Sequence, residues 1–141
     1  KNMQEFIVDE TSIKVGSELV WPWIAIEPEK GQILAQSMSQ ERNMFVAEHF
    51  LSGIVHDYGI HHVSTDGGTW YPMACRFLKL KHHVHSLWEK SLIERKMQYL
   101  KDRTESFDDY FPCQREKCEL NHIKNWLRLF VCMHNKERIN A

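Results

Sequence analysis

The chain has 141 residues, of which 43% are hydrophobic and 26% charged, and its formal net charge is -1. This size predicts one domain with a real core and is too short for two typical domains. The sequence has neither a run of about 18 apolar residues nor a charged start followed by an apolar run, so we expect a soluble, cytoplasmic protein. Its four irregularly spaced cysteines do not resemble a disulfide framework, and we expect reduced thiols.

The charge is unevenly distributed along the chain. Residues 1–75 carry 4 Lys and Arg against 10 Asp and Glu, whereas residues 76–141 carry 14 against 9. A basic second half beside an acidic first half is typical of a polyanion-binding face next to an acidic metal pocket, although solvated helix faces give the same count.

The first forty residues predict three antiparallel strands. Residues 5–15 are rich in β-branched side chains and end at a Gly-Ser turn, residues 19–26 are almost wholly apolar, and residues 32–39 alternate. Because proline cannot donate to a strand ladder, we expect Pro22 at a bulge or an unpaired edge.

After these strands, helices and strands alternate. A helix over residues 39–58 ends at Gly59, and a second helix over residues 71–80 has Pro72 in its first turn. The remaining expected elements are short strands at 61–65 and 82–85, a long helix at 87–110 that carries Leu92, Ile93, Met97 and Leu100 on one side, an interrupted stretch at 111–119, and a final helix at 121–137. This order is typical of an α/β, ribonuclease H-like fold of the retroviral-integrase type, with a mixed central sheet of about five strands and helices on both faces.

Three acidic residues stand out by their local context. Asp9 lies inside an apolar strand, where a carboxylate is costly to bury without compensation, and Asp66 stands at the exit of a short strand before two glycines. Glu94 lies in the long helix beside Ile93. Convergent carboxylates are what two Mg²⁺ or Mn²⁺ ions need. Singly, each residue also fits a plainer role, on a solvated strand face, in a turn or on a helix surface.

The long helix places Glu94, Gln98 and Lys101 on one face, because they are spaced by four and three residues. Such a stripe suits a site in which the glutamate binds metal and the lysine a DNA phosphate. A solvated face with an internal salt bridge would have the same spacing.

Three segments carry a family resemblance: FIVDETSIKVGSELVWPWIAI, VSTDGGTWYP and SLIERKMQYLKDRTESFDDYFP. Together and in this order they resemble the acidic motifs of insertion-sequence DDE transposases of the IS-six family, in a form similar to its archaeal members. The resemblance implies a ribonuclease H-like fold in which Asp9, Asp66 and Glu94 form the catalytic, metal-binding triad. It also implies a basic residue two turns past the glutamate, which is Lys101 here.

The resemblance further implies DNA strand cleavage and transfer of the free 3'-hydroxyl to a target, with two Mg²⁺ or Mn²⁺ ions and no nucleotide cofactor. Lys101, Gln98, Arg95 and Lys90 would contact DNA phosphates, and a homodimer would hold the two DNA ends. Family members usually begin with a helix-turn-helix segment, so we expect residues 1–141 to be a catalytic domain without it. The alternative function is a truncated, non-catalytic remnant that folds and binds DNA or dimerises.

Other reactive residues allow different interpretations. The histidines at 82, 83 and 85, with His61 and His62, invite a metal hypothesis, but their spacing on a Lys-rich strand favours phosphate binding or simple exposure. Cys113, Cys118 and His122, with Cys132 or His134, leave a structural zinc site open.

The remaining alternatives concern the segment after Asp66. Cys75 is expected in the core rather than as a nucleophile, and Trp70 and Tyr71 are core candidates more than base-stacking ones. Gly67 and Gly68 lack the rest of any phosphate-loop motif.

Overall fold

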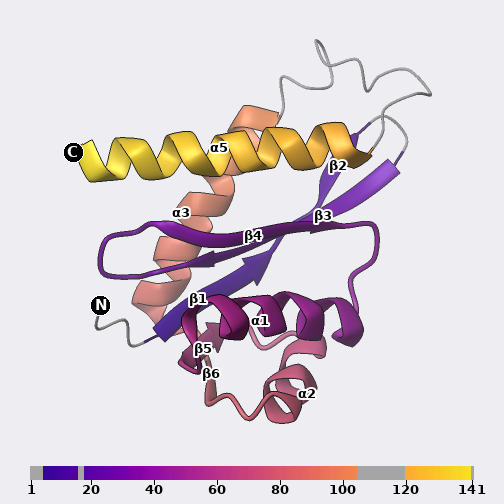
Figure 1. Ribbon diagram of the computed structural model, residues 1–141, viewed down its shortest axis with the longest axis vertical. Helices are drawn as coiled ribbons and strands as arrows, with labels where there is room; N and C mark the ends of the chain where they lie inside the picture. Colours follow the sequence, from indigo (N-terminus) through magenta and orange to yellow (C-terminus); the bar gives the residue numbers. More distant parts are fainter. Residues whose placement is uncertain (1–4, 16–17, 105–119, 141) are drawn as a thin grey trace.

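Six strands form a mixed sheet in the computed structural model, which describes residues 5–15, 18–104 and 120–140 (Figure 1). The strands are β1 (Glu5–Glu10), β2 (Ile13–Val15), β3 (Glu18–Ile26), β4 (Ile33–Ser39), β5 (His62–Thr65) and β6 (His82–Val84). The helices are α1 (Met44–Tyr58), α2 (Trp70–Phe77), α3 (Leu87–Thr104) and α5 (Leu120–Asn140).

The strand pairings explain why the sheet is mixed. β3 runs antiparallel to β1, to β2 and to β4, so the first part of the chain forms a meander, as expected. β5 then pairs parallel with β1, and β6 parallel with β5. The α/β order with a mixed sheet confirms the expected fold class.

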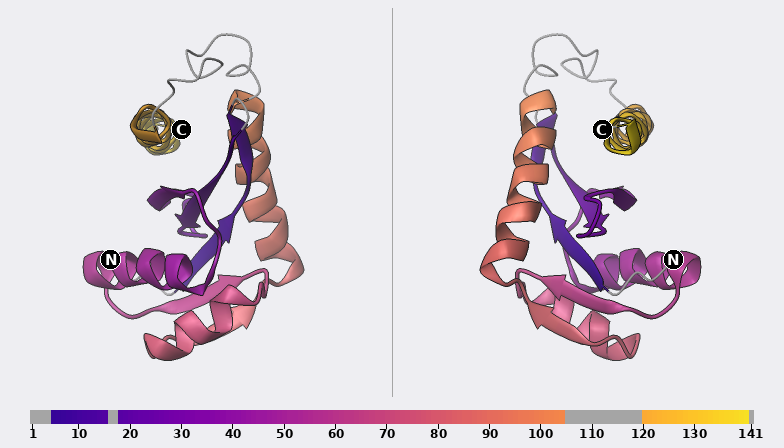
Figure 2. Two further views of the ribbon diagram at one scale, coloured as in Figure 1. Left: turned by 90° about the vertical axis from the view of Figure 1, so that its right-hand side faces the viewer. Right: turned by 90° about the vertical axis from the view of Figure 1, so that its left-hand side faces the viewer.

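Helices cover both faces of this sheet, and each face has its own hydrophobic cluster. Along β1, Ile7 packs with buried residues of α3 and α5, whereas Phe6 and Val8 pack with residues of α1 and α2. This alternation follows from the two-residue period of a strand. Figure 2 shows α3 and α1 on opposite sides of the sheet.

Several boundaries differ from the expected ones. The first segment is two strands, because residues 11 and 12 separate β1 from β2. Pro22 lies inside β3 opposite this break, with Met38 as its partner in β4, and its carbonyl accepts from the Thr11 amide (3.1 Å). The register shift between β3 and β4 lies instead at Ala25/Ile26.

Helix boundaries follow from capping. α1 begins at Met44 rather than at residue 39, because the Asn43 side chain accepts from the Val46 amide (3.0 Å) and β4 extends to Ser39. It ends at Gly59, as expected, with φ of 86°. α2 ends at Phe77, short of the expected residue 80, and Pro72 does lie in its first turn.

The α5 helix packs over the same hydrophobic cluster as α3 and crosses that helix (Figure 1). Tyr99 of α3 and Phe130 of α5 have ring centroids 5.5 Å apart. The Asn135 side chain donates to the Ile33 carbonyl (2.7 Å) and accepts from the Ile33 amide (2.8 Å). The last helix is therefore tied to the first residue of β4.

The stretch at 111–119 and the end of the expected 87–110 helix lie outside the described residues. None of the described helices is long and apolar enough to cross a membrane.

Candidate functional site

Three carboxylates meet at one edge of the sheet. Asp9, Glu10 and Asp66 each offer an oxygen within 4.8 Å of the others. Asp9 and Glu10 end β1, and Asp66 directly follows β5, its parallel neighbour. Because the carboxyl ends of parallel strands meet at the same edge, this topology brings residues 56 positions apart into one acidic group.

Burial and neighbouring charges perturb Asp9. Its carboxyl accepts from the Glu10 amide (2.9 Å), yet burial, together with the negative charges of Glu10, Asp66 and Glu94, raises its pKa to about 7. Repulsion of this kind is relieved by a proton or by a cation. The group therefore has the electrostatics of a cation site.

Glu94 lies beside this group without joining its tight core. It is exposed on α3, next to the buried Ile93, which belongs to the same cluster as Ile7 of β1. Glu94 is thus on the Asp9 side of the sheet, close enough for its charge to raise the Asp9 pKa.

Glu10 is the residue that sequence reasoning missed. Its side chain is turned to the opposite face from Asp9 and is buried, where Oε1 accepts from the Tyr71 hydroxyl (2.6 Å) and from Trp70 Nε1 (3.4 Å). Arg42 donates to its other oxygen (3.3 Å). Burial raises the pKa of Glu10, while these two aromatic donors and Arg42 act against the rise. The feature of the sequence that indicates Glu10 is a second acidic residue directly after Asp9 in an apolar strand.

Arg42 is held between two aromatic rings. Its guanidinium carbon lies 4.0 Å from the centroid of Trp21 and 4.3 Å from that of Trp70. This cation–π arrangement fixes the residue that faces Glu10. Tyr71 is fully buried, which confirms the core interpretation for it, whereas Trp70 is half-buried and packs against the same cluster.

The glycines after Asp66 are required by packing. Gly67 has φ of 84°, a left-handed conformation that favours glycine. A Cβ on Gly68 would lie 2.9 Å from ring carbons of Trp70 and 3.2 Å from Asp66 Oδ1, which accepts from the Gly68 amide. The two glycines thus fold the Asp66 loop tightly against Trp70.

The candidate metal-binding and DNA-binding residues of α3 lie on its outer surface. Lys90, Glu94, Arg95, Gln98 and Lys101 are all exposed. Gln98 donates to Asp102 Oδ1 (2.8 Å), so part of this surface is joined by contacts within the helix.

The histidines at 82, 83 and 85 are half-buried and hydrogen-bonded, so simple exposure was the wrong expectation, whereas phosphate binding stays a prediction. His85 is hydrogen-bonded to Ser64 Oγ and His82 to Thr65 Oγ1, both at 2.6 Å. His83 Nε2 donates to Glu89 Oε1 (2.9 Å). Burial lowers the pKa of His82 and His85. His82 and His85 are thus bonded to residues of the neighbouring strand β5, and His83 to the start of α3.

Of the cysteine predictions, the structure tests the one for Cys75 but not those for Cys113 and Cys118. Cys75 is buried in α2, and burial raises its pKa to about 11, which agrees with a core thiol. Cys113 and Cys118 lie outside the described residues, as does the side chain of His122, so the zinc hypothesis for them stays a prediction.

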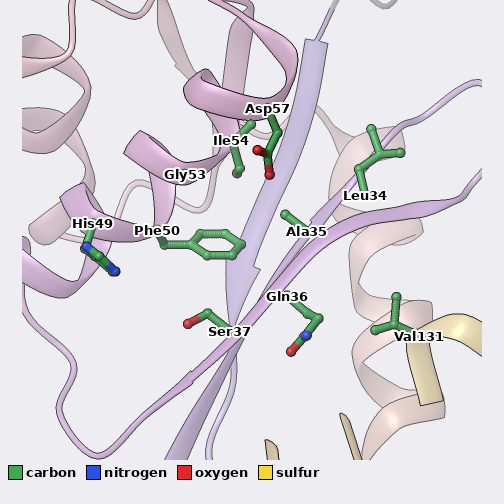
Figure 3. Close-up of a pocket in the computed structure, with 10 residues that line it drawn as sticks. All are labelled: Leu34, Ala35, Gln36, Ser37, His49, Phe50, Gly53, Ile54, Asp57 and Val131. Carbon is green, nitrogen blue, oxygen red and sulfur yellow. The ribbon is translucent and has the colours of Figure 1, made fainter. Parts of the chain in front are cut away.

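A surface cavity of about 440 Å³ lies elsewhere, between β4 and α1, with Val131 of α5 at its border (Figure 3). Its lining includes Gln36, His49 and Asp57 but none of the clustered carboxylates. The acidic group thus lies at the edge of the sheet and outside this cavity.

Comparison with known proteins shows the family of the chain. A family model described as a DDE domain, DDE_Tnp_IS240, matches residues 3–130. The chain belongs to this DDE transposase domain family. Uncharacterized protein MJ0017 of Methanocaldococcus jannaschii is 28% identical over 129 residues, which are 91% of this chain and 59% of that protein. The DDE domain therefore spans somewhat more than half of this relative.

Solved retroviral structures share the fold. The integrase catalytic core of HTLV-2, determined with magnesium in a dimeric form, superposes with a TM-score of 0.65 at 16% identity, over 87% of this chain and 81% of that chain. The catalytic core of BIV integrase superposes with a TM-score of 0.61 at 16% identity, over 80% of this chain and 77% of that chain. A simian T-cell lymphotropic virus intasome with PP2A regulatory subunit B56 gamma gives 0.67 at 19% identity, over 85% of this DDE domain and 45% of that chain. These likenesses establish the ribonuclease H-like, integrase-type fold.

Proposed function

We propose that this DDE domain cleaves DNA and transfers the resulting 3'-hydroxyl to a target strand during transposition of an insertion sequence of the IS-six family, archaeal type. The observation that carries the proposal is the meeting of Asp9 and Asp66 at the ends of two parallel strands, with Glu94 on the adjacent helix. These three residues are the proposed catalytic and metal-binding triad.

The donor chemistry fits Mg²⁺ or Mn²⁺. The residues gathered at this edge offer carboxylate oxygens, the donors that hard divalent cations prefer, and their mutual repulsion is what bound cations would relieve. Two such ions, when bound, supply an activated water or hydroxyl nucleophile and stabilise the entering and leaving oxygens.

The chain's own residues would then position the ligands. Asp9 is fixed by the Glu10 amide and Asp66 by the Gly68 amide, so both carboxylates are pre-oriented. Glu10, through Tyr71 and Trp70, holds the first turn of α2 against β1 and with it the Asp66 loop. It acts as a positioning residue in this proposal.

DNA would lie along the exposed face of α3. Lys101, with Gln98, Arg95 and Lys90, would contact backbone phosphates on this side of the acidic group. A homodimer that holds two DNA ends belongs to the same proposal.

Manganese-dependent nicking of a labelled DNA duplex tests the proposal. We expect cleavage by the 141-residue chain and its loss, by at least about a hundredfold, in Asp66→Asn, because one metal ligand is removed. Asp57→Asn is the matched control, since Asp57 is an exposed aspartate of α1 remote from the group.

Equal activity in the parent chain and Asp66→Asn would end the catalytic assignment. Salt-sensitive DNA binding without metal-dependent nicking would favour the alternative, a non-catalytic remnant.

A further inference from the structure

A second group of potential ligands lies near the start of β1, away from the acidic group. Glu5 begins β1, His83 is in β6, and Glu89 is in the first turn of α3, and each offers a ligand atom within 4.8 Å of the others. Asp9 is four residues further along β1, about 13 Å away at the rise of a strand. This cluster is therefore separate from the acidic group of the proposed active site.

Two carboxylates share one imidazole in this cluster. His83 Nε2 is 2.9 Å from Glu89 Oε1 and 3.9 Å from Glu5 Oε2. The Glu89 side chain is 5% exposed and that of Glu5 24%. Two carboxylates drawn together in a partly buried place face one imidazole, which carries at most a single positive charge. A divalent cation would balance the pair.

A second imidazole lies beside the cluster with an unused nitrogen. The rings of His62 and His83 have centroids 4.6 Å apart. His62 Nε2 is inaccessible to solvent and has no hydrogen-bond partner among the described residues. Glu5 and His62 are paired in register between β1 and β5, so both side chains project from the same face of the sheet. Buried polar atoms normally have a partner, and a metal ion would be one.

We propose that Glu5, His83 and Glu89 bind one divalent transition-metal ion of the Zn²⁺ class, and that the His62 ring, which lies outside this group of atoms in the structure, turns to become the fourth ligand. Imidazole combined with carboxylate suits zinc, whereas magnesium and calcium prefer oxygen donors alone. The inference goes beyond the proposed DNA chemistry and does not depend on it.

The consequence of this site is structural. The ion joins the first residue of β1, the strand β6 and the start of α3, which carries Glu94 five residues after Glu89. Five residues of helix span about 7.5 Å. The metal would therefore fix the position from which α3 runs across the sheet toward Asp9.

Zinc binding to the chain with Asp9→Asn and Asp66→Asn tests the proposal, because this background removes the competing carboxylates. We expect calorimetry to show binding of one Zn²⁺ and a raised Tm on zinc addition. Adding His83→Gln or, separately, Glu5→Gln should weaken this binding by at least about tenfold and abolish the Tm shift. His56→Gln, which alters an exposed histidine of α1, should change neither.

Two further readouts keep the result unambiguous. Far-ultraviolet circular dichroism should show that each variant is folded without metal. Co²⁺ in place of Zn²⁺ should give a spectrum without a thiolate charge-transfer band, which separates this site from any cysteine site. Zinc affinity unchanged by both His83→Gln and Glu5→Gln, or a thiolate band that accounts for all the bound cobalt, would overturn the proposal.

Discussion

Asp9 and Glu10 are adjacent residues that project to opposite faces of one strand. Asp9 shares its face with Ile7, and Glu10 shares the other with Val8. Both carboxylates belong to the acidic group with Asp66, but only Glu10 receives three side-chain donors, from Tyr71, Trp70 and Arg42. The same side-chain chemistry therefore serves as a candidate ligand on one side and as a structural acceptor on the other.

The raised pKa of Asp9 predicts a specific pH dependence of stability. Its pKa is about 7 in the folded chain against 3.8 for the free group, so the folded state holds the proton more tightly than the unfolded state. With a chelator present, the free energy of unfolding should therefore fall as pH rises from about 4 to about 7 and then level off. The fall attributable to Asp9 should be a few kcal/mol at most, at about 1.4 kcal/mol per pKa unit.

Urea denaturation across this pH range measures the effect, and Asp9→Asn is the comparison. The variant should lack this part of the slope and should be the more stable protein at about pH 7. Mn²⁺ should raise the stability of the parent chain there more than that of the variant. Identical slopes in the two proteins would contradict the assignment of the pKa to Asp9.

Tyr71→Phe should destabilise the chain through Glu10. The change keeps the buried ring and removes the hydroxyl that donates to Glu10 Oε1 at 2.6 Å, leaving a buried carboxylate with fewer donors. We expect a loss of about 1.5–3 kcal/mol in the free energy of unfolding, measured by urea titration.

Tyr58→Phe is the matched control, since the Tyr58 hydroxyl donates to the Leu34 carbonyl from a residue that is 37% exposed. A smaller loss is expected there, and equal losses would argue against a special role of the Tyr71–Glu10 bond.

Local context in the sequence identified some of these residues and missed others for a physical reason. Asp9 stands out as an acid within an apolar strand, and Asp66 as an acid at a strand exit. Arg42 is different, because its place depends on Trp21 and Trp70, which meet only after β3, the β4–α1 connection and α2 have packed. The partners of His83 likewise come from the start of β1 and from α3. Contacts of this kind leave no local pattern.

At the scale of the elements, periodicity identified the order of strands and helices, and capping decided their ends. The expected helix began at residue 39, the last residue of β4, and so included the connection at 40–43, whereas the Asn43 cap marks the true start. Capping also explains the start of α3, where the Ser86 amide donates to Glu89 Oε1 (2.8 Å) and the Glu89 amide to Ser86 Oγ (3.2 Å). Such reciprocal bonds are legible in the sequence as Ser-x-x-Glu.

Gly53, in α1, and Gly68, in the loop after β5, should respond in opposite ways to substitution by alanine. Gly53→Ala in α1 meets no atom within 4 Å, so it should stabilise the protein by about 0.5–1 kcal/mol through the better helix propensity of alanine. Gly68→Ala would place its Cβ 2.9 Å from the Trp70 ring, and we expect a loss of about 1–3 kcal/mol.

Thermal denaturation of both variants in one buffer is the measurement. A Gly68→Ala protein as stable as the parent would mean that the Trp70 ring moves aside without cost, and Arg42 would then be less firmly held than its two ring contacts indicate.

At the scale of the whole molecule, the sheet is covered by two separate layers. One face is closed by α1, which follows the meander directly, and by α2, which follows β5, whereas the other face is closed by α3 and α5. The topology was predictable because each expected element exists in the expected order. The way α5 crosses α3 was not, since it depends on long-range contacts such as that of Asn135 with Ile33.

Asn135→Ala tests how firmly α5 is attached. The substitution removes both hydrogen bonds to the Ile33 backbone and leaves this buried strand start with fewer partners, so we expect a loss of about 1–3 kcal/mol. Hydrogen exchange of the Ile33 amide should quicken beyond the global change. Asn125→Ala, at an exposed position of the same helix, is the control and should alter stability by less than about 0.5 kcal/mol.

The bond between Ile33 and Asn135 spans 102 residues of sequence. During synthesis at the ribosome, β4 emerges long before its α5 partner, and the apolar side chains beneath α5, including Ile33 and Met38, stay accessible during that interval. Contacts of such large sequence separation slow folding. A nascent chain stalled before residue 120 should therefore be captured by chaperones, while one extended beyond residue 140 should be released.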